Sequence, residues 1–129
     1  MTPDQNQAQA APGAPAVDFE QLRAASGEDP NFLRDLAKLY FDQAAEIMPA
    51  LRAALEERSA DDVEYLAHKL AGASLSCGMS AMVAPLRELE KRGRNGDLTG
   101  ADAHMVQAAA SLDIVRATVQ EYLASGKTA

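Results

Sequence analysis

The sequence lacks tryptophan, has one cysteine and draws only 5% of its 129 residues from aromatic side chains. A single cysteine excludes an internal disulfide. With so few aromatics, the core must consist of Leu, Ala, Val, Ile and Met, a mixture that suits packed helices. Basic residues are also scarce, 12 against 19 acidic ones, which gives a formal net charge of -7. This negative charge disfavours nucleic acid and anionic membranes as partners.

Long hydrophobic runs are absent as well. No stretch approaches the roughly 20 apolar residues that span a bilayer. The N-terminus has neither the basic start nor the apolar segment of a signal peptide, so we expect a cytoplasmic protein. The length fits one domain, and because a single bundle closes its own core we expect a monomer.

The chain divides into a tail and one domain. Residues 1–16 hold three prolines and three glutamines but no large aliphatic side chain beyond the initiator, so we expect a disordered tail there. Residues 17–125 form the expected domain, followed by a flexible C-terminus at 126–129.

Helical spacing and capping signals fill the domain. We expect helices over 18–25, 30–58, 59–77, 81–92 and 99–125, with a loop at 92–100. Pro49 should kink or split the second helix, and Pro85 should make the first turn of the fourth irregular. No segment with the alternating pattern of a β-strand is as long as these helical segments. The expected fold is all-α, an antiparallel four-helix bundle with a short additional N-terminal helix.

The third helix carries a histidine that points away from its apolar side. At about 100° per residue, His68 lies roughly 140° from the centre of the apolar stripe, so its imidazole faces outward. Gly72 follows one turn later on the same exposed surface, with Leu75 beside it. Glycine inside a helix costs about 1 kcal/mol relative to alanine. Close approach of another molecule beside His68 would explain why residue 72 is glycine.

An exposed imidazole is mostly uncharged at physiological pH and keeps one nitrogen lone pair free to act as a nucleophile. Such a group can carry a phosphoryl group. From position and composition alone, an ordinary solvated histidine beside an incidental glycine is an equal alternative.

Further motifs carry a family resemblance over about residues 17–124. These are AHKLAGASLSCG at 67–78, LE at 89–90, RNGDL at 94–98, and the segments DPNFLRDLAKLYFDQA and MPALRAALEERSADDVEYLAHKL before the histidine. Together they resemble the histidine-containing phosphotransfer (HPt) domain family of bacterial multistep phosphorelays.

The resemblance implies that His68 accepts a phosphoryl group from a receiver-domain phosphoaspartate and passes it to another response regulator, without kinase activity of its own. The partners would be receiver domains and a hybrid sensor histidine kinase. The divalent metal, Mg²⁺, would belong to the receiver, with no cofactor in this chain. Gly72 matches the small residue over which the receiver's loops close. Glu90 matches an acidic side chain that orients the imidazole in some members, although a solvated surface glutamate is an equal alternative.

Two positions, Ala71 and Met79, depart from the family pattern. The lysine usual three residues after the histidine is replaced by Ala71, so Lys69 would have to reach back to a phosphoryl oxygen. Ala71 and Leu75 would form a partly apolar rim for receiver docking. Met79 stands where a small residue is usual, and we expect it to cover the end of the bundle.

Other functions fit less well. Di-iron bundles repeat Glu-x-x-His on two inward helix faces, whereas Glu64 and His68 are four apart and face outward. His104 reads as a surface residue, and Cys77 as a small core residue. The serious alternative is an interaction module that binds receivers or a kinase with the same bundle but carries no phosphate.

Overall fold

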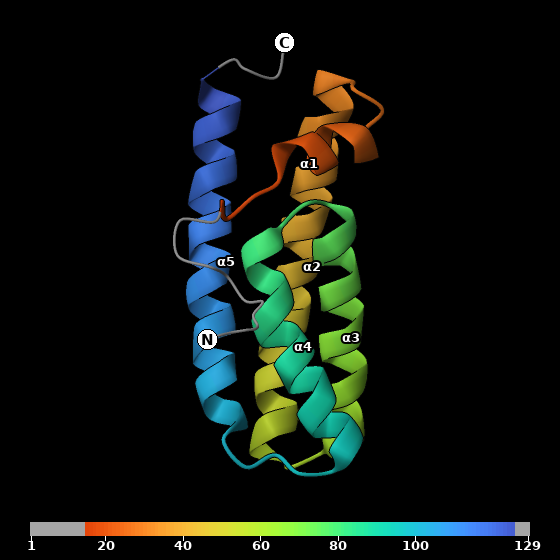
Figure 1. Ribbon diagram of the computed structural model, residues 1–129, viewed down its shortest axis with the longest axis vertical. Coiled ribbons are helices and arrows are strands. Elements are labelled where there is room, and N and C mark those ends of the chain that lie inside the picture. Colours follow the sequence, from red (N-terminus) through yellow and green to blue (C-terminus); the bar gives the residue numbers. More distant parts are fainter. Residues whose placement is uncertain (1–14, 126–129) are drawn as a thin grey trace, which may run out of the picture.

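The computed structural model describes residues 15–125, and all the regular secondary structure in this range is helical. The helices are α1 (Phe19–Ala25), α2 (Pro30–Glu56), α3 (Ala60–Ser76), α4 (Ser80–Asn95) and α5 (Ala101–Ala124). Helices α2 to α5 run in alternating directions and form an antiparallel bundle, with α1 at one end (Figure 1). The expected all-α four-helix bundle with a short extra helix is confirmed. The segments 1–14 and 126–129, to which we assigned a disordered tail and a flexible C-terminus, lie outside the described residues.

Side-chain caps account for the first two helix starts. The Asp18 carboxylate accepts a hydrogen bond from the backbone N–H of Gln21 at 3.1 Å. Asp29 accepts from the backbone N–H of Asn31 at 2.9 Å, and Pro30 occupies the first helical position. Each carboxylate thereby satisfies an N–H group that has no partner within the helix. Both expected starts are confirmed.

Other boundaries differ from expectation. The Ser59 hydroxyl donates to the Asp62 carboxylate at 2.8 Å and caps no backbone group of α3. Helix α5 begins after Gly100, whose φ is +77°, one residue beyond the expected cap at Thr99. Helix α2 ends two residues early because Arg58 has a positive φ of 56°. Such φ values lie outside the helical region, so they end or precede helices.

Both internal prolines are accommodated within helices. Of the expected kink or split at Pro49, the split is wrong, because helix α2 runs through this residue without a break. Helix α4 begins at Ser80 and continues through Pro85 to Asn95, beyond the expected range on both sides. A proline removes one backbone hydrogen bond. Tertiary packing holds these helices together despite that loss, since α4 makes extensive contact with both α3 and α5.

The core is aliphatic, as the composition predicts. Its largest fully buried side chains are all Leu, Met and Val: Leu22, Leu33, Leu51, Leu70, Met79, Met82, Leu86, Leu89, Met105, Val63, Val115 and Val119. Met79 is among them, which confirms that it fills the bundle end. One polar pair is enclosed: the Tyr40 hydroxyl lies 2.6 Å from the Ser74 hydroxyl, which donates to the Leu70 carbonyl at 2.7 Å. This pair fixes α2 against α3.

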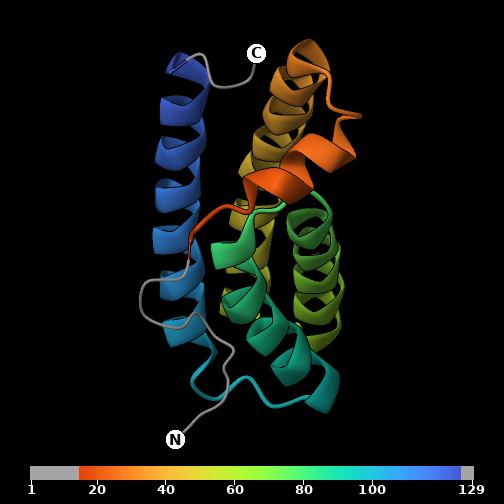
Figure 2. The ribbon, with the colours of Figure 1, turned by 45° about the horizontal axis from the view of Figure 1, so that its top comes forward.

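Helix α1 lies across the turn that joins α3 to α4 (Figure 2). The Asp18 N–H donates to the Gly78 carbonyl at 2.7 Å, and the Ala81 N–H donates to the Ala16 carbonyl at 2.9 Å. Gly78 has a φ of +77°, and a Cβ there would collide with the Asp18 carbonyl oxygen. Ala16 therefore belongs to the folded part, one residue earlier than the expected boundary. Within residues 15–125, no helix combines the length and the apolar character required to cross a membrane.

Candidate functional site

The site lies where α3 and α4 pack most closely, the most extensive helix contact in the bundle. Gly93 of α4 is buried against the backbone of α3. A Cβ at this position would stand 2.6 Å from the Glu64 nitrogen and 2.7 Å from the Ala60 oxygen, which is too close for any side chain. Because the helices are antiparallel, residues before Gly93 face residues after Glu64 (Figure 1). This packing brings Glu90 opposite His68.

His68 stands on the exposed side of α3, as its helical position predicts. Its side chain is 66% exposed, and its Nδ1 atom lies 2.7 Å from Oε2 of Glu90. The Glu90 side chain is only 6% exposed. The alternative of a solvated surface glutamate is therefore wrong, and the expected contact with the imidazole is present.

Two arginines complete the surroundings of Glu90. Arg87 Nη1 donates to Oε1 at 2.7 Å, and Arg94 Nη2 donates to Oε2 at 2.7 Å. Arg94 Nε also donates to Glu64 Oε2 at 3.2 Å. Burial alone would raise the pKa of Glu90, but hydrogen bonds from Arg87 and His68 and the charges of both residues hold this pKa below its usual value. Glu90 is thus an ionised carboxylate.

The ionised carboxylate determines which imidazole nitrogen carries the hydrogen. A carboxylate only accepts hydrogen bonds, so Nδ1 of His68 must be the protonated nitrogen and must donate to Glu90. In the neutral ring, Nε2 then holds the free lone pair. Arg87 Nη1 lies 3.5 Å from Nδ1. Because both nitrogen atoms carry hydrogen, they form no hydrogen bond with each other. The contact places the positive charge of the guanidinium beside the ring. In its neutral form the imidazole therefore has a fixed tautomer, with Nε2 as the nucleophilic nitrogen.

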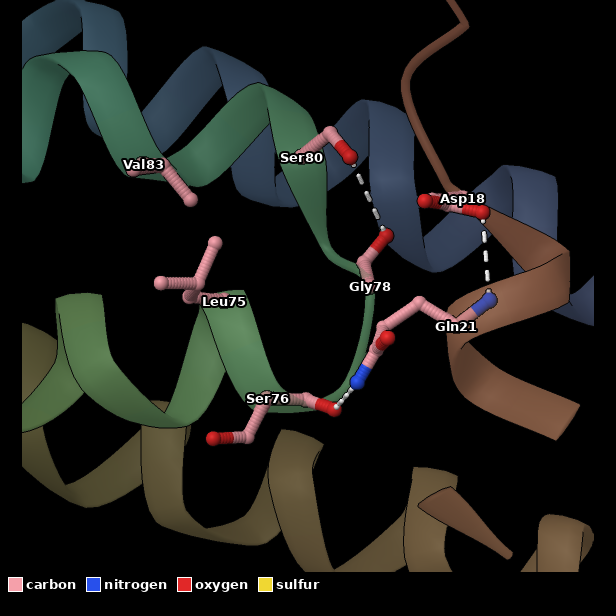
Figure 3. Close-up of a pocket in the computed structure, with 7 residues that line it drawn as sticks. All are labelled: Asp18, Gln21, Leu75, Ser76, Gly78, Ser80 and Val83. Atoms are coloured by element: carbon pink, nitrogen blue, oxygen red, sulfur yellow. Dashed lines mark hydrogen bonds between the residues drawn. The ribbon is translucent and has the colours of Figure 1, made fainter. Parts of the chain in front are cut away.

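The surface around His68 contains an open position and an apolar side chain. A Cβ added at Gly72 would meet nothing within 4 Å, which confirms that the bundle itself does not require glycine there. Leu75, two helical turns from His68, is 60% exposed. Leu75 lies at a groove where α3, α4 and α1 meet, and its side chain points toward Val83 (Figure 3). On the α1 side of this groove, the Gln21 side chain donates to the Ser76 carbonyl at 2.9 Å.

Ala71 is not part of this surface. It is fully buried, so the expected docking rim of Ala71 and Leu75 is wrong for Ala71. By helical geometry Ala71 lies roughly 60° around α3 from His68, on the flank of Glu64, against which α4 packs. Lys69 is exposed, and its ammonium group pairs with no carboxylate among residues 15–125.

A family model, the Hpt domain, matches residues 35–123. Among solved structures, histidine-containing phosphotransfer protein B (HptB) from Pseudomonas aeruginosa PAO1 superimposes with a TM-score of 0.80 at 25% identity. That match covers 88% of this chain and 98% of the HptB chain. No curated protein matches in sequence. The chain belongs to the Hpt family. Its role is histidine phosphotransfer in a phosphorelay.

Sequence reasoning missed three residues that shape the site in this Hpt domain. Arg87 and Arg94 stand three residues before and four residues after Glu90, the spacings at which helical side chains meet. That spacing was visible in the sequence. Gly93 gave a weaker signal, because a glycine near a helix end equally suggests a loop.

The remaining histidine and the cysteine lie outside the site. His104 is partly buried, and its Nε2 atom lies 3.9 Å from Glu88 Oε1. Cys77 is buried in the core, as expected, and burial raises the pKa of its thiol. Within residues 15–125, no three His, Cys, Asp or Glu side chains group in a way that could hold a metal ion.

Proposed function

We propose that His68 is the phosphoryl carrier of this Hpt domain. The supporting observation is a mostly exposed imidazole whose Nδ1 donates to the buried, ionised Glu90 at 2.7 Å. The Nε2 lone pair attacks the phosphorus of a receiver phosphoaspartate and forms the N–P bond. The P–O bond breaks, and its electron pair stays on the aspartate carboxylate. Nδ1 keeps its hydrogen, so the phosphorylated ring becomes a cation that Glu90 stabilises.

The reverse reaction passes the phosphoryl group to an aspartate of a second receiver. In this proposal the chain contributes an oriented nucleophile, and the receiver supplies Mg²⁺ and the acceptor or donor aspartate. The chain has no kinase activity of its own, acts in the cytoplasm as a monomer, and obtains phosphate through receivers, including that of a hybrid sensor kinase. Gly72 gives the receiver's loops room beside the imidazole, because a Cβ is absent there.

Leu75 supports docking of the receiver. It is exposed, it lies on the same face of α3 as His68, and the groove beside it is lined by Val83 and by polar groups of α1 (Figure 3). An exposed apolar side chain close to a nucleophile is typical of a surface that a partner covers during the reaction.

The test is phosphotransfer with a histidine-specific readout. The protein is incubated with phosphorylated receivers and, separately, with phosphoramidate, a small phosphoryl donor. The product is examined for phosphate that is labile in acid and stable in base. We expect such a label in the wild type and none in His68→Gln, with helicity unchanged because an exposed side chain contributes little to stability.

His104→Gln is the matched control, since the chain has two histidines, and it should keep the label. Label that survives in His68→Gln, or no label from phosphoramidate and from any receiver, would contradict the proposal. The second outcome would favour the interaction module that carries no phosphate.

A further inference from the structure

Phosphorylation of His68 would change the balance of charges around the imidazole. A phosphoryl group brings about 1.5 to 2 negative charges to the ring at neutral pH. Glu90 already places a buried carboxylate at 2.7 Å from Nδ1 of the same ring. The cationic ring that forms on phosphorylation lies between these two anions but balances only one negative charge, so a further cation beside the ring lowers the energy of the phosphorylated state. The chain must therefore supply a positive group close to His68, or rely entirely on the receiver.

Arg94 and Lys69 are poor candidates for that group. Arg94 is held between two carboxylates, donating through Nη2 to Glu90 and through Nε to Glu64. Only Nη1 lies outside these two bonds, so Arg94 cannot offer two nitrogen donors in parallel to another anion without leaving a carboxylate. Lys69 follows His68 directly and therefore points roughly 100° away around the helix axis.

Arg87 differs in position and in the use of its donors. Its Nη1 group donates to Glu90 Oε1 at 2.7 Å and lies 3.5 Å from Nδ1 of His68, so Nε and Nη2 take part in neither contact. Its side chain is 39% exposed. Arginine keeps its charge at all relevant pH values and can bind two oxygen acceptors in parallel. Among the arginines and lysines of residues 15–125, it is the one whose side chain contacts the imidazole directly, at 3.5 Å.

We propose that Arg87 binds the phosphoryl oxygens when His68 carries phosphate on Nε2. Nη1 stays on Glu90, and the Nε and Nη2 N–H groups turn to the phosphoryl oxygens. The guanidinium thus lies between the two anions and reduces their repulsion. No proton is transferred from Arg87. The inference rests on the proposed function of His68 and adds the group in this chain that recognises the phosphate.

The first experiment uses phosphoramidate, so that no receiver supplies a competing cation. The rate constants of phosphorylation and of hydrolysis of the phosphohistidine are measured by phosphorus NMR for the wild type, Arg87→Ala and Arg87→Lys. We expect phosphorylation of Arg87→Ala to be slower by about tenfold, equivalent to about 1.4 kcal/mol. That matches the usual size of a charge-assisted hydrogen bond. Arg87→Lys should recover to within about threefold, because it keeps the charge but loses the paired donors.

Lys91→Ala is the matched control. Lys91 is an exposed cation on the same helix. Its removal changes the net charge equally and should alter the rate by less than about twofold, because exposed charges are well screened. An Arg87→Ala rate equal to that of Lys91→Ala would overturn the proposal.

A second comparison separates direct binding of phosphate from an effect through Glu90. Arg87→Ala is repeated in a Glu90→Gln background. If Arg87 only positions Glu90, the substitution has no further effect there, and that result would overturn the proposal. If Arg87 binds the phosphoryl oxygens, a loss of at least about fivefold persists. A wild type that takes no phosphate at all would instead contradict the proposed function of His68.

A measurement on the wild type covers the case in which Arg87→Ala does not fold. The Nε–H resonance of Arg87 is followed by nitrogen NMR while the protein is phosphorylated with phosphoramidate. We expect this resonance to shift and its exchange with water to slow, because the N–H becomes bound to a phosphoryl oxygen. An unchanged Arg87 signal in fully phosphorylated protein would also overturn the proposal.

Discussion

Gly93 of α4 lies against the backbone of Glu64 in α3, so closely that a Cβ at residue 93 would stand 2.6 Å from the Glu64 nitrogen. The contact is one helical turn from the His68–Glu90 hydrogen bond on both helices. The separation of α3 and α4 at this point therefore determines whether the Glu90 carboxylate reaches Nδ1. Gly93 takes no part in the chemistry, but its close packing sets the geometry of the His68–Glu90 pair.

Gly93→Ala should weaken both the fold and the site. The new methyl group has to push α3 away from α4, and overpacking of this kind costs about 1 to 3 kcal/mol. We expect a lower free energy of unfolding in urea and slower phosphorylation by phosphoramidate, since Glu90 is drawn away from His68. Unchanged stability would show that the two backbones are not in close contact at this point.

Gly72→Ala should have the opposite effect on stability. Nothing lies within 4 Å of the added Cβ, and alanine favours a helix over glycine by about 1 kcal/mol. We expect the free energy of unfolding to rise by about that amount. Transfer from a phosphorylated receiver should slow more than phosphorylation by phosphoramidate, because only the receiver must close over this position. Equal effects on both donors would contradict a role for Gly72 in partner access.

Glu90 should contribute stability that depends on pH. Its pKa is lower in the folded protein than the usual value of about 4.3, despite the opposing effect of burial, because Arg87 and His68 bind the ionised form. The unfolded chain therefore takes up the proton first as pH falls. The contribution is complete above the unfolded pKa and is lost as pH falls through the folded pKa.

Urea unfolding of the wild type and Glu90→Gln between pH 3 and pH 7 measures this contribution. The difference in unfolding free energy between the two proteins should be constant above about pH 5 and should shrink below the ordinary glutamate pKa. A difference that stays constant down to pH 3 would argue against the ion pairs around Glu90.

Tyr40 should limit stability at alkaline pH. Burial raises its pKa to about 12, and the hydrogen bond with Ser74 only partly opposes this shift. Because the folded pKa lies above the unfolded value near 10, the neutral phenol stabilises the fold below pH 10. That stability is lost as pH rises toward 12. Tyr40→Phe should be less sensitive to pH over this range in thermal unfolding, and equal sensitivity would place the effect at another group.

Leu75→Ser should impair receiver docking without affecting the fold. Leu75 is 60% exposed, so its replacement should change the free energy of unfolding by less than about 0.5 kcal/mol. We expect weaker binding of receivers and a normal rate with phosphoramidate. Ile114→Ser, a comparably exposed aliphatic residue on α5, is the control and should bind receivers normally. Equal losses in both variants would indicate that Leu75 has no special role.

The sequence predicted those features that depend only on local helical geometry. The outward direction of His68, the open side of Gly72 and the caps at Asp18 and Asp29 follow from helical period and from short-range hydrogen bonding. Each depends on residues within one or two turns, so each could be read without knowing where the other helices lie.

Apart from helix boundaries, the errors concern contacts between helices. Ala71 was expected at an exposed rim because it lies near His68 around the helix, but the close packing at Gly93 brings α4 over that flank and buries it. The burial of Glu90 and its two arginine partners also depends on how α4 is placed. The continuity of α2 through Pro49 has the same origin, since packing outweighs the local penalty of proline.

Within residues 15–125, the side chains of the hydrogen-bonded network around the imidazole all come from a single helical hairpin, between Glu64 and Arg94. The long helices α2 and α5 add no side chain to this network. Substitutions on the outer faces of these two helices should therefore leave the hydrogen bonds around His68 unchanged.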